Sequence, residues 1–472
     1  MVLGCSDRKK IIEVLRKKGN FALQKQENTL IPVRKTKGET TQYVVCPNCE
    51  GYYSKLSLRK HYQKCQKSVP RGQRSLMILS RQISLNIHES ASKTLKEIMA
   101  HLRNDDIFKT ICHDRLIISY GNKIVKKLSD PHHAKEIRAK LRHLGRFLEH
   151  IRTLEPEITD LCSAFHPKHY MSCIKTAQFL AGMNNGKFKS PAVALSTGII
   201  LKKVAKHMKT FLIQNELVDQ ITTLKQFSHL LTEDYGTSVN KTAIENMTQD
   251  RRNKTVTLPV MTDLEKFYKY VCEQRIKSLG SCTENFSYKA WKDLASYTLV
   301  SVLVFNRRRP GETERMLISD FVNAKTVNFK EDVELFNYLD VTEKEAANEY
   351  LLVPLRGKLN RSVSAVVDRN TYKCLKTVIL HRNKIGVKDK NPYVFGLPGG
   401  DGRECRHLEG CALLRHFAGQ CQDLENPSSL RATLLRKHLA TQCSVIGMEQ
   451  NEIADVANHL GHAEQIHQEI YR

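Results

Sequence analysis

The C-terminal stretch of the chain, residues 429–472, reads SLRATLLRKHLATQCSVIGMEQNEIADVANHLGHAEQIHQEIYR. Leu435, Leu439 and Cys443 recur at four-residue intervals, which is typical of the buried stripe of a helix. Asn451 is placed to cap a second helix, because asparagine is a favoured N-cap residue. The stretch therefore predicts two helices followed by a short polar tail. The fold of the chain is inferred from this stretch together with the upstream segments described below.

An ordered series of polar side chains runs through the same stretch. Thr433 and Arg436 are three residues apart and would share a helix face, His462 follows the second helix, and Tyr471 lies nine residues further on. Arginine can pair two phosphate oxygens, tyrosine can form a covalent intermediate, and histidine can move a proton. Taken singly, each residue is more simply interpreted as an ordinary surface side chain. The ordered set favours chemistry on a phosphodiester.

Two upstream segments carry further basic side chains. Residues 296–316, SYTLVSVLVFNRRRPGETERM, predict an apolar helix that ends in Arg307, Arg308 and Arg309. Three arginines at a helix end could simply complement the helix dipole, and any of them could reach a phosphate. Residues 349–368, EYLLVPLRGKLNRSVSAVVD, predict a β-hairpin, because two β-rich runs flank a turn.

These segments together resemble the active-site boxes of the tyrosine recombinases, the phage-integrase family. The resemblance rests on an arginine followed three residues later by glutamate, a lysine in the hairpin turn, LRKHLAT, LGH and the final tyrosine, and it covers roughly the last two hundred residues. It implies an α+β catalytic domain over 255–472 that cleaves and rejoins double-stranded DNA through a 3′-phosphotyrosyl link, with no metal or nucleotide needed for catalysis. The implied catalytic residues are Arg309, Lys358, Arg436, His462 and Tyr471. Glu312 and Thr433 are the implied auxiliary residues, and Arg307, Arg308, Arg356 and Arg361 are the expected DNA contacts.

The chain departs from the family pattern at several places. Thr433 stands where the family usually has histidine, and a threonine hydroxyl cannot shuttle a proton at neutral pH. His438 is expected on another helix face, and Asn306 with Arg307 replaces the family's glycine. The resemblance implies a homo-oligomer on DNA, but one residue follows Tyr471 where the family commonly continues with a helix that docks on a neighbouring subunit, which puts this assembly in doubt. Two alternatives stay open: a recombinase, or a domesticated DNA-binding protein that keeps the fold without the reaction.

A small metal site is predicted within residues 41–69. Cys46 and Cys49 are separated by two residues, and His61 and Cys65 by three residues on a probable helix. This spacing is close to that of a ββα zinc finger, in which four ligands hold a structural zinc ion and leave no open position for chemistry.

The remaining chain is expected to be mainly helical. Residues 70–248 carry three- and four-residue apolar spacing throughout, and the resemblance implies a core-binding-like domain there. Residues 1–40 are expected to form a basic, poorly ordered tail, and Leu56 is expected in the core of the finger. One apolar stripe of the helical region consists of Leu141, Leu144, Phe147, Leu148 and Ile151. The basic residues interleaved with it, which would face phosphates, are Arg138, Lys140, Arg142 and Arg146.

Composition agrees with a nucleic-acid partner. The chain has 472 residues with 75 Lys+Arg against 49 Asp+Glu, a net charge of +26. Such a balance favours a polyanion, and no apolar run approaches the roughly 20 residues needed to span a bilayer. The 14 cysteines indicate a reducing compartment, and we expect the nucleus. The whole is mainly α with a small β-sheet, as in an integrase-like protein derived from a eukaryotic mobile element. RNA binding through the finger and the basic helices is a third alternative.

Overall fold

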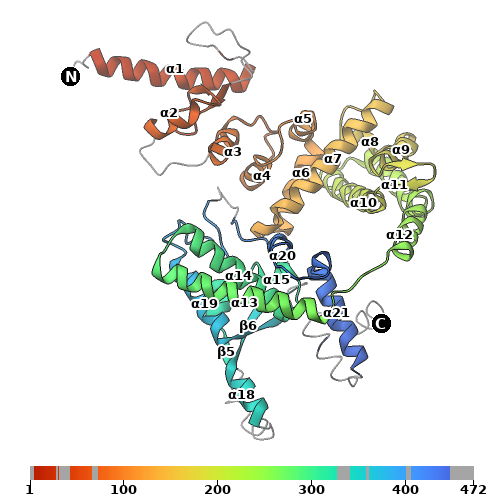
Figure 1. The fold of residues 1–472 in the computed structure, drawn as a ribbon. Helices are drawn as coiled ribbons and strands as arrows, with labels where there is room; N and C mark the ends of the chain where they lie inside the picture. The colour runs from red at the N-terminus through yellow and green to blue at the C-terminus, as the bar shows by residue number, and fades with distance from the viewer. Residues whose placement is uncertain are drawn as a thin grey trace. The chain divides into compact units, whose positions relative to one another are not determined.

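The computed structural model describes residues 5–27, 30, 43–65, 73–326, 341–357, 361–399, 405–446 and 456 (Figure 1). The described chain is mainly helical with small antiparallel sheets, as predicted. It divides into two compact units, here called the N-terminal and C-terminal units, with the boundary between Thr255 and Val256. Among the described helices, none combines the length and the apolar character required to span a bilayer.

The N-terminal unit begins with a long helix and a small ββα motif. The elements are α1 (Cys5–Glu27), β1 (Tyr43–Val45), β2 (Tyr52–Ser54), α2 (Leu58–Cys65) and α3 (Gln73–Ser84). Strands β1 and β2 pair antiparallel, with Tyr43 opposite Ser54 and Val45 opposite Tyr52. Residues 5–27 of the expected poorly ordered tail form helix α1, and the side chain of Lys17 contacts Gly51 of the finger, so tertiary packing supports this helix.

The rest of the N-terminal unit is a helical body with one short hairpin. Its α-helices are α4 (Lys93–Met99), α5 (Asp106–His113), α6 (Arg115–Lys127), α7 (Ala134–Leu154), α8 (Leu161–Ala164), α9 (Tyr170–Leu180), α10 (Pro191–Gln214), α11 (Val218–Glu233) and α12 (Lys241–Asn253). Single turns lie at η2 (Pro131–His133), η3 (Pro167–His169) and η4 (Gly236–Asn240). Strands β3 (Met183–Asn184) and β4 (Lys187–Phe188) form a hairpin whose turn residues, Asn185 and Gly186, have φ of 46° and 73°. Asparagine and glycine are the residues that adopt such positive φ values most readily.

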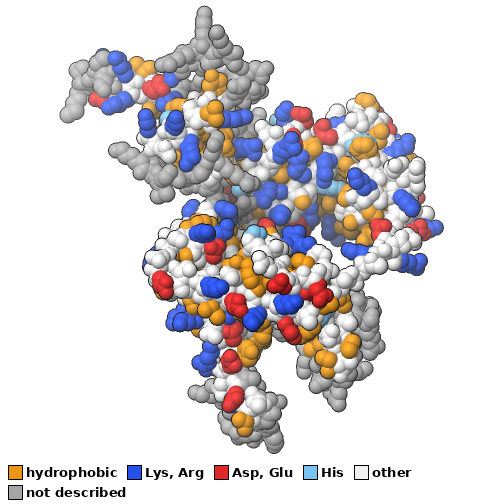
Figure 2. Space-filling model, viewed as in Figure 1, with side chains coloured by type: hydrophobic (Ala, Val, Ile, Leu, Met, Phe, Trp, Pro, Cys, Tyr) orange, Lys and Arg blue, Asp and Glu red, His pale blue; other side chains and the backbone are white. Residues whose placement is uncertain are grey.

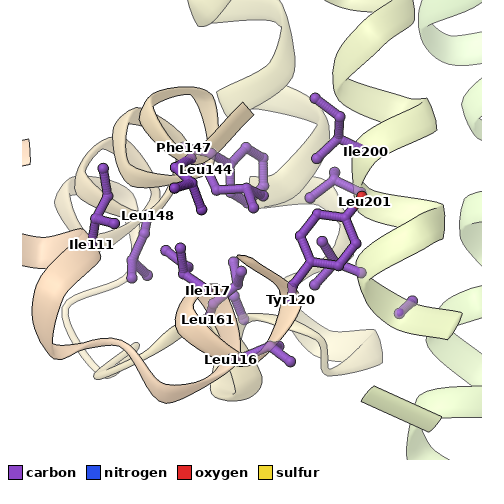
Figure 3. Packing of buried hydrophobic residues seen from close by; sticks show 14 of the residues in the cluster. Ile111, Leu116, Ile117, Tyr120, Leu144, Phe147, Leu148, Leu161, Ile200 and Leu201 are labelled. Carbon is purple, nitrogen blue, oxygen red and sulfur yellow. The ribbon is translucent and has the colours of Figure 1, made fainter. Parts of the chain in front are cut away.

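The core of this body contains the predicted stripe of α7. Leu141, Leu144, Phe147, Leu148 and Ile151 are all fully buried. Figure 3 shows Leu144, Phe147 and Leu148 grouped with Ile111 and Ile117 from neighbouring helices. Gly145 lies against Ile111, so α5 and α7 approach closely at a position without a side chain.

Two of the basic residues of α7 are engaged within the fold. Both terminal nitrogens of the Arg142 guanidinium group, Nη1 and Nη2, donate to the carboxylate of Asp105, at 2.9 and 2.8 Å, and Asp105 also caps α5 by accepting from Phe108 N. Lys140 forms an ion pair with Glu136 one turn earlier. The prediction of a phosphate-facing row is therefore wrong for Arg142, because that side chain joins α7 to the start of α5.

The C-terminal unit packs helices on a three-stranded sheet. Its helices are α13 (Met261–Glu284), α14 (Tyr288–Asn306), α15 (Pro310–Thr313), α16 (Ile318–Val322), α18 (Val341–Glu349), α19 (Arg369–His381), α20 (Gly410–Ala418) and α21 (Ala432–Val445), with a single turn at η6 (Pro427–Ser429). The sheet has the order β5 (Lys325–Thr326), β6 (Tyr350–Arg356), β7 (Ser362–Asp368), and all of its pairs are antiparallel. Strands β6 and β7 form the predicted hairpin, with Arg356 opposite Ser362.

Helix α14 is the central element of this unit. Trp291 is fully buried and donates from Nε1 to the carbonyl of Val378 on α19, 3.0 Å away. The first turn of α13 holds the segment that leads into α21. The carboxylate of buried Asp263 accepts hydrogen bonds from the backbone N–H groups of Glu425 and Asn426, both at 2.9 Å. The two segments that carry the predicted arginines, the end of α14 and α21, are thus each tied to the core of the same unit.

Candidate phosphate site and metal centre

The predicted arginines lie where α14 ends. Arg307 closes the helix in the left-handed conformation, with φ 50° and ψ 30°, and its N–H donates to the carbonyl of Leu303. This conformation is usually left to glycine, because a side chain strains it. Pro310 then begins α15, as proline does at the first position of a helix. Residues 307–309, called the arginine loop below, are therefore held in a sharp connection between two helices.

Asn306 fixes this connection to the sheet. Its side chain is buried, donates to the carbonyl of Val366 at 2.8 Å and accepts from the N–H of Val366 at 2.7 Å. It also donates to the carbonyl of Val302 at 3.0 Å. The amide therefore pairs with β7 as another strand would, and the arginine loop starts from a fixed point at the edge of the sheet.

The arginines of the loop differ in environment. Arg308 is 2% exposed, with its Nη1 4.0 Å from Glu312 Oε2, whereas the side chain of Arg309 is 32% exposed and donates from Nη1 to Glu312 Oε1 at 3.0 Å. Burial lowers the pKa of Arg308 to about 10, and the nearby charges of Arg436 and Arg309 act in the same direction while Glu312 opposes them. The carboxylate of Glu312 thus forms ion pairs with the guanidinium groups of both Arg308 and Arg309.

Helix α21 brings Arg436 to the same place. Arg436 is 5% exposed and close enough to Arg308 for the two positive charges to interact, although the residues are 128 positions apart in sequence. Leu435 and Cys443 of the predicted stripe are buried with it. Thr433 lies in the first turn of α21 and is exposed, so it does not share the burial of Arg436.

His438 also contacts the arginine loop, an interaction that the sequence did not predict. It is 4% exposed, and Arg307 Nη1 lies 3.0 Å from His438 Nδ1. Burial lowers the pKa of His438, and the charge of Arg307 lowers it further. The imidazole is accordingly neutral and accepts the hydrogen bond from Arg307. Sequence spacing gave no signal for this contact, because a contact between α14 and α21 depends on their packing.

The remaining predicted residues divide into two groups. Arg356 and Arg361 flank the hairpin turn and are exposed, with Gly357 N donating to the carbonyl of Arg361 at 2.8 Å. Lys358, His462 and Tyr471 lie outside the described residues. The structure thus brings the arginine loop, Glu312, Arg436 and His438 together.

The second site is the predicted metal centre of the ββα motif. Cys46, Cys49, His61 and Cys65 offer ligand atoms that all lie within 4.8 Å of one another. Cys49 Sγ is 3.3 Å from His61 Nε2, and Asn48 Nδ2 lies 3.1 Å from Cys65 Sγ. Three thiols and one imidazole are a donor set that zinc prefers, so the cluster can hold a metal ion such as zinc.

The core of the finger differs from the prediction in one residue. Leu56 is 85% exposed, whereas Leu58 is fully buried and Tyr62 is 6% exposed. Leu58 and Tyr62 lie four apart on α2 and pack with Leu76 of α3. The prediction for Leu56 is wrong, because that residue precedes α2 in the turn after β2.

Comparisons with known proteins give limited information. No family model matches the chain, and no curated protein matches it. One similar solved structure is a XerH site-specific recombinase bound to a palindromic difH substrate in a post-cleavage complex, with 13% identity and a TM-score of 0.38 over 83% of this chain and 90% of that chain. Another is XerH bound to a difH substrate in a pre-cleavage complex, with 15% identity and a TM-score of 0.32 over 73% and 93%. At such values the likeness carries no argument about the site.

Proposed function

We propose that the C-terminal unit binds double-stranded DNA and holds one backbone phosphate at the cluster formed by the arginine loop and Arg436. The observation that carries the proposal is the burial of Arg308 and Arg436 within reach of each other's charge. Two guanidinium groups this close together form a positively charged cluster that a bound anion would stabilise. A phosphodiester is the anion that guanidinium groups match best in geometry.

The charge of the chain supports this choice of anion. The net charge of +26 is distributed along the sequence, and Figure 2 shows Lys and Arg side chains scattered over the visible face of the N-terminal unit. A polyanion such as DNA gains from many such contacts at once, whereas a small phosphate ester would not. Arg356 and Arg361, exposed beside the hairpin turn, would add contacts to the DNA backbone.

The reaction that fits this site is strand cleavage by a tyrosine. In the proposed step the phenolic oxygen of Tyr471 attacks phosphorus, the bond to the 5′ oxygen breaks, and a 3′-phosphotyrosyl link forms. Lys358 supplies the proton that the leaving 5′ oxygen takes up, and the phenol's proton passes to water. Arg309 and Arg436 stabilise the charge that grows on the phosphate, and His462 assists by hydrogen bonding. Rejoining reverses the same bonds, so no nucleotide is consumed.

A second function, DNA binding without cleavage, is favoured by one observation. Thr433, at the position where an acid–base histidine would be expected, is exposed on the first turn of α21. His438, the next imidazole on that helix, is engaged by Arg307. Neither Thr433 nor His438 would then act as the acid–base group on α21, and the protein would bind DNA without cleaving it.

We further propose that Cys46, Cys49, His61 and Cys65 hold zinc in a structural role. The four residues come from the β1–β2 connection and from α2, so one ion would join both halves of the motif. With four protein ligands, zinc has no open position for a substrate.

The test uses the full-length protein and a pool of nicked duplexes of random sequence, in which the cleaved strand loses a short fragment and cannot be rejoined. A denaturant-stable protein–DNA adduct is expected, and it should vanish in Tyr471→Phe while binding persists. Arg436→Ala should lose the adduct and weaken duplex binding, by the amount that one phosphate contact contributes. Arg369→Ala is the matched control, because Arg369 donates to the carbonyl of Asn348, away from the cluster.

Each alternative has its own outcome in this experiment. Tight duplex binding without any adduct would reject cleavage and leave DNA binding as the function. An adduct that survives in Tyr471→Phe would reject the assigned nucleophile. Failure of the wild type to bind duplex DNA would reject both functions, and preferential binding of single-stranded RNA would favour the third alternative.

A further inference from the structure

Within the described part of the chain, helix α1 contacts the finger through one side. The methylene groups of Lys17 lie against Gly51, and its ammonium group interacts electrostatically with Cys49 and Tyr53. Phe21, one turn further along, is 9% exposed. These residues define the side of α1 that faces its own chain.

The other side of α1 presents apolar side chains to solvent. Ile11, Ile12, Val14 and Leu15 are 45%, 63%, 50% and 63% exposed. At about 100° per residue, Val14, Ile11 and Leu15 fall within roughly 100° of the helix circumference, with Ile12 at the margin. Four large aliphatic residues within five positions of one exposed helix are more than the scattered apolar residues of an ordinary surface, and such a stripe marks an interaction surface.

The charges around this stripe are basic. Over Cys5–Glu27 the helix has seven Lys or Arg and three Asp or Glu, so its net charge is 7 − 3 = +4. Two of the three acidic side chains are already neutralised within α1, since Asp7 pairs with Lys10 and Glu13 pairs with Arg16 and Lys17. A partner that covers the stripe would therefore meet a positively charged border.

We propose that the exposed stripe of α1 (Ile11, Ile12, Val14 and Leu15) is a docking surface for an amphipathic helix of another protein whose apolar face is bordered by Asp and Glu. The positive charge of α1 favours such a partner, because the partner's Asp and Glu side chains would lie opposite the Lys and Arg side chains of α1. A second copy of the chain would bring two helices of the same positive charge together. A membrane surface fits less well, because the stripe spans little more than one turn and has no aromatic side chain to anchor it at an interface.

The helix-on-helix geometry also matches the size of the stripe. Apolar residues at positions i, i+3 and i+4 are the anchors by which one amphipathic helix packs on another. Arg8 and Lys18 lie on the same side of α1, about one turn before Ile11 and one turn after Leu15, and would face acidic side chains at the two ends of the partner's apolar face. The apolar anchors would supply most of the affinity, and the rim charges would set the orientation and the partner's chemistry.

The experiment measures binding of a fluorescently labelled synthetic helix of about 20 residues, with leucine at helical spacing and glutamate elsewhere, to the full-length protein by anisotropy. The double variant Ile11→Ser/Leu15→Ser should weaken binding by about tenfold or more, because two buried aliphatic anchors are lost. Val218→Ser/Ile244→Ser is the matched control, since both residues are comparably exposed, at 68% and 54%, elsewhere in the same unit. Lys18→Glu, which leaves the stripe intact, should also weaken binding, and the same peptide with lysine in place of glutamate should not bind.

Four results would overturn the proposal. The first two are that the stripe variant and its control bind the acidic peptide equally, and that the wild-type protein does not bind the acidic peptide. The third is that the wild-type protein self-associates in sedimentation and the stripe variant does not. The fourth is that the protein binds vesicles of phosphatidylcholine with phosphatidylserine and does not bind the peptide. Hydrogen exchange of α1 in the double variant distinguishes a lost surface from a lost helix. If exchange shows that the helix has unfolded, the Lys18→Glu comparison decides, because that variant keeps every apolar residue.

Discussion

Asn306→Ala is the substitution that most directly tests how the arginine loop is positioned. The alanine removes the side chain that pairs with Val366 N–H at 2.7 Å and with Val366 C=O at 2.8 Å, in an environment where Asn306 itself is 2% exposed. Leaving a buried backbone group without its partner costs about 1–3 kcal/mol. Two such groups on β7 therefore give an expected loss of about 2–6 kcal/mol in the local stability of that strand.

Hydrogen–deuterium exchange measures this loss where it occurs. The amide of Val366 should exchange at least about thirtyfold faster in Asn306→Ala, since each 1.4 kcal/mol corresponds to a factor of ten. Asn348→Ala is the control, because Asn348 is exposed and its contact with Arg369 uses the backbone carbonyl. Duplex affinity should fall in the first variant and persist in the second. Unchanged protection at Val366 in Asn306→Ala would refute the assignment of this amide as the anchor of the loop.

Three further predictions concern the metal centre and the helical body. Cys46→Ser should lower the bound zinc from one ion per chain to none, because the cluster then keeps three of its four ligands. Cys421→Ser, the control, should retain the zinc ion. Zinc bound to Cys46→Ser would contradict the proposed site. Gly198→Ala should lower the free energy of unfolding of the N-terminal unit, measured in urea, by about 1–3 kcal/mol, because the new methyl group would overlap the buried ring of Tyr235. Gly236→Ala, whose methyl group meets open space, should leave that free energy unchanged. Burial lowers the pKa of His143 to about 4, so stability should be constant above its ordinary pKa of 6.5 and should fall as the pH drops from 6.5 towards 4, by about 2 kcal/mol at pH 5. His143→Gln should flatten that profile, and an unchanged profile would contradict the role of this histidine.

Much of the fold follows from patterns that are local in sequence. The stripe of α7 was predictable because residues at three- and four-residue spacing share one helix face whatever lies opposite. The β6–β7 hairpin was predictable because two β-rich runs flank a turn that contains glycine. The four ligands of the finger were predictable because a metal ion constrains ligand spacing more strictly than packing constrains a core residue.

The failures share a different cause, which is dependence on a partner distant in sequence. Leu56 and Leu58 are two residues apart and equally apolar, and Leu58 is the buried one because it packs with Leu76 of α3. Arg142 could not be separated from the other basic residues of α7 without knowing that Asp105 lies opposite. The same holds for α1, whose contact with Gly51 of the finger is made by the methylene groups of Lys17, while Ile11, Ile12, Val14 and Leu15 are exposed.

The contact of Arg307 with His438 explains how the chain manages without the glycine expected at the end of α14. A non-glycine residue in the left-handed conformation costs about 1–2 kcal/mol, and it persists when surrounding contacts determine it. Here the side chain that causes the strain also donates to a buried imidazole on α21, which offsets part of that cost and ties the loop to the helix of Arg436. A glycine would relieve the strain but would remove this tie. The replacement therefore couples the two arginine-bearing segments: a shift of α21 would be passed to the loop that carries Arg308 and Arg309, whereas protonation of His438 would remove the acceptor of this hydrogen bond and uncouple them.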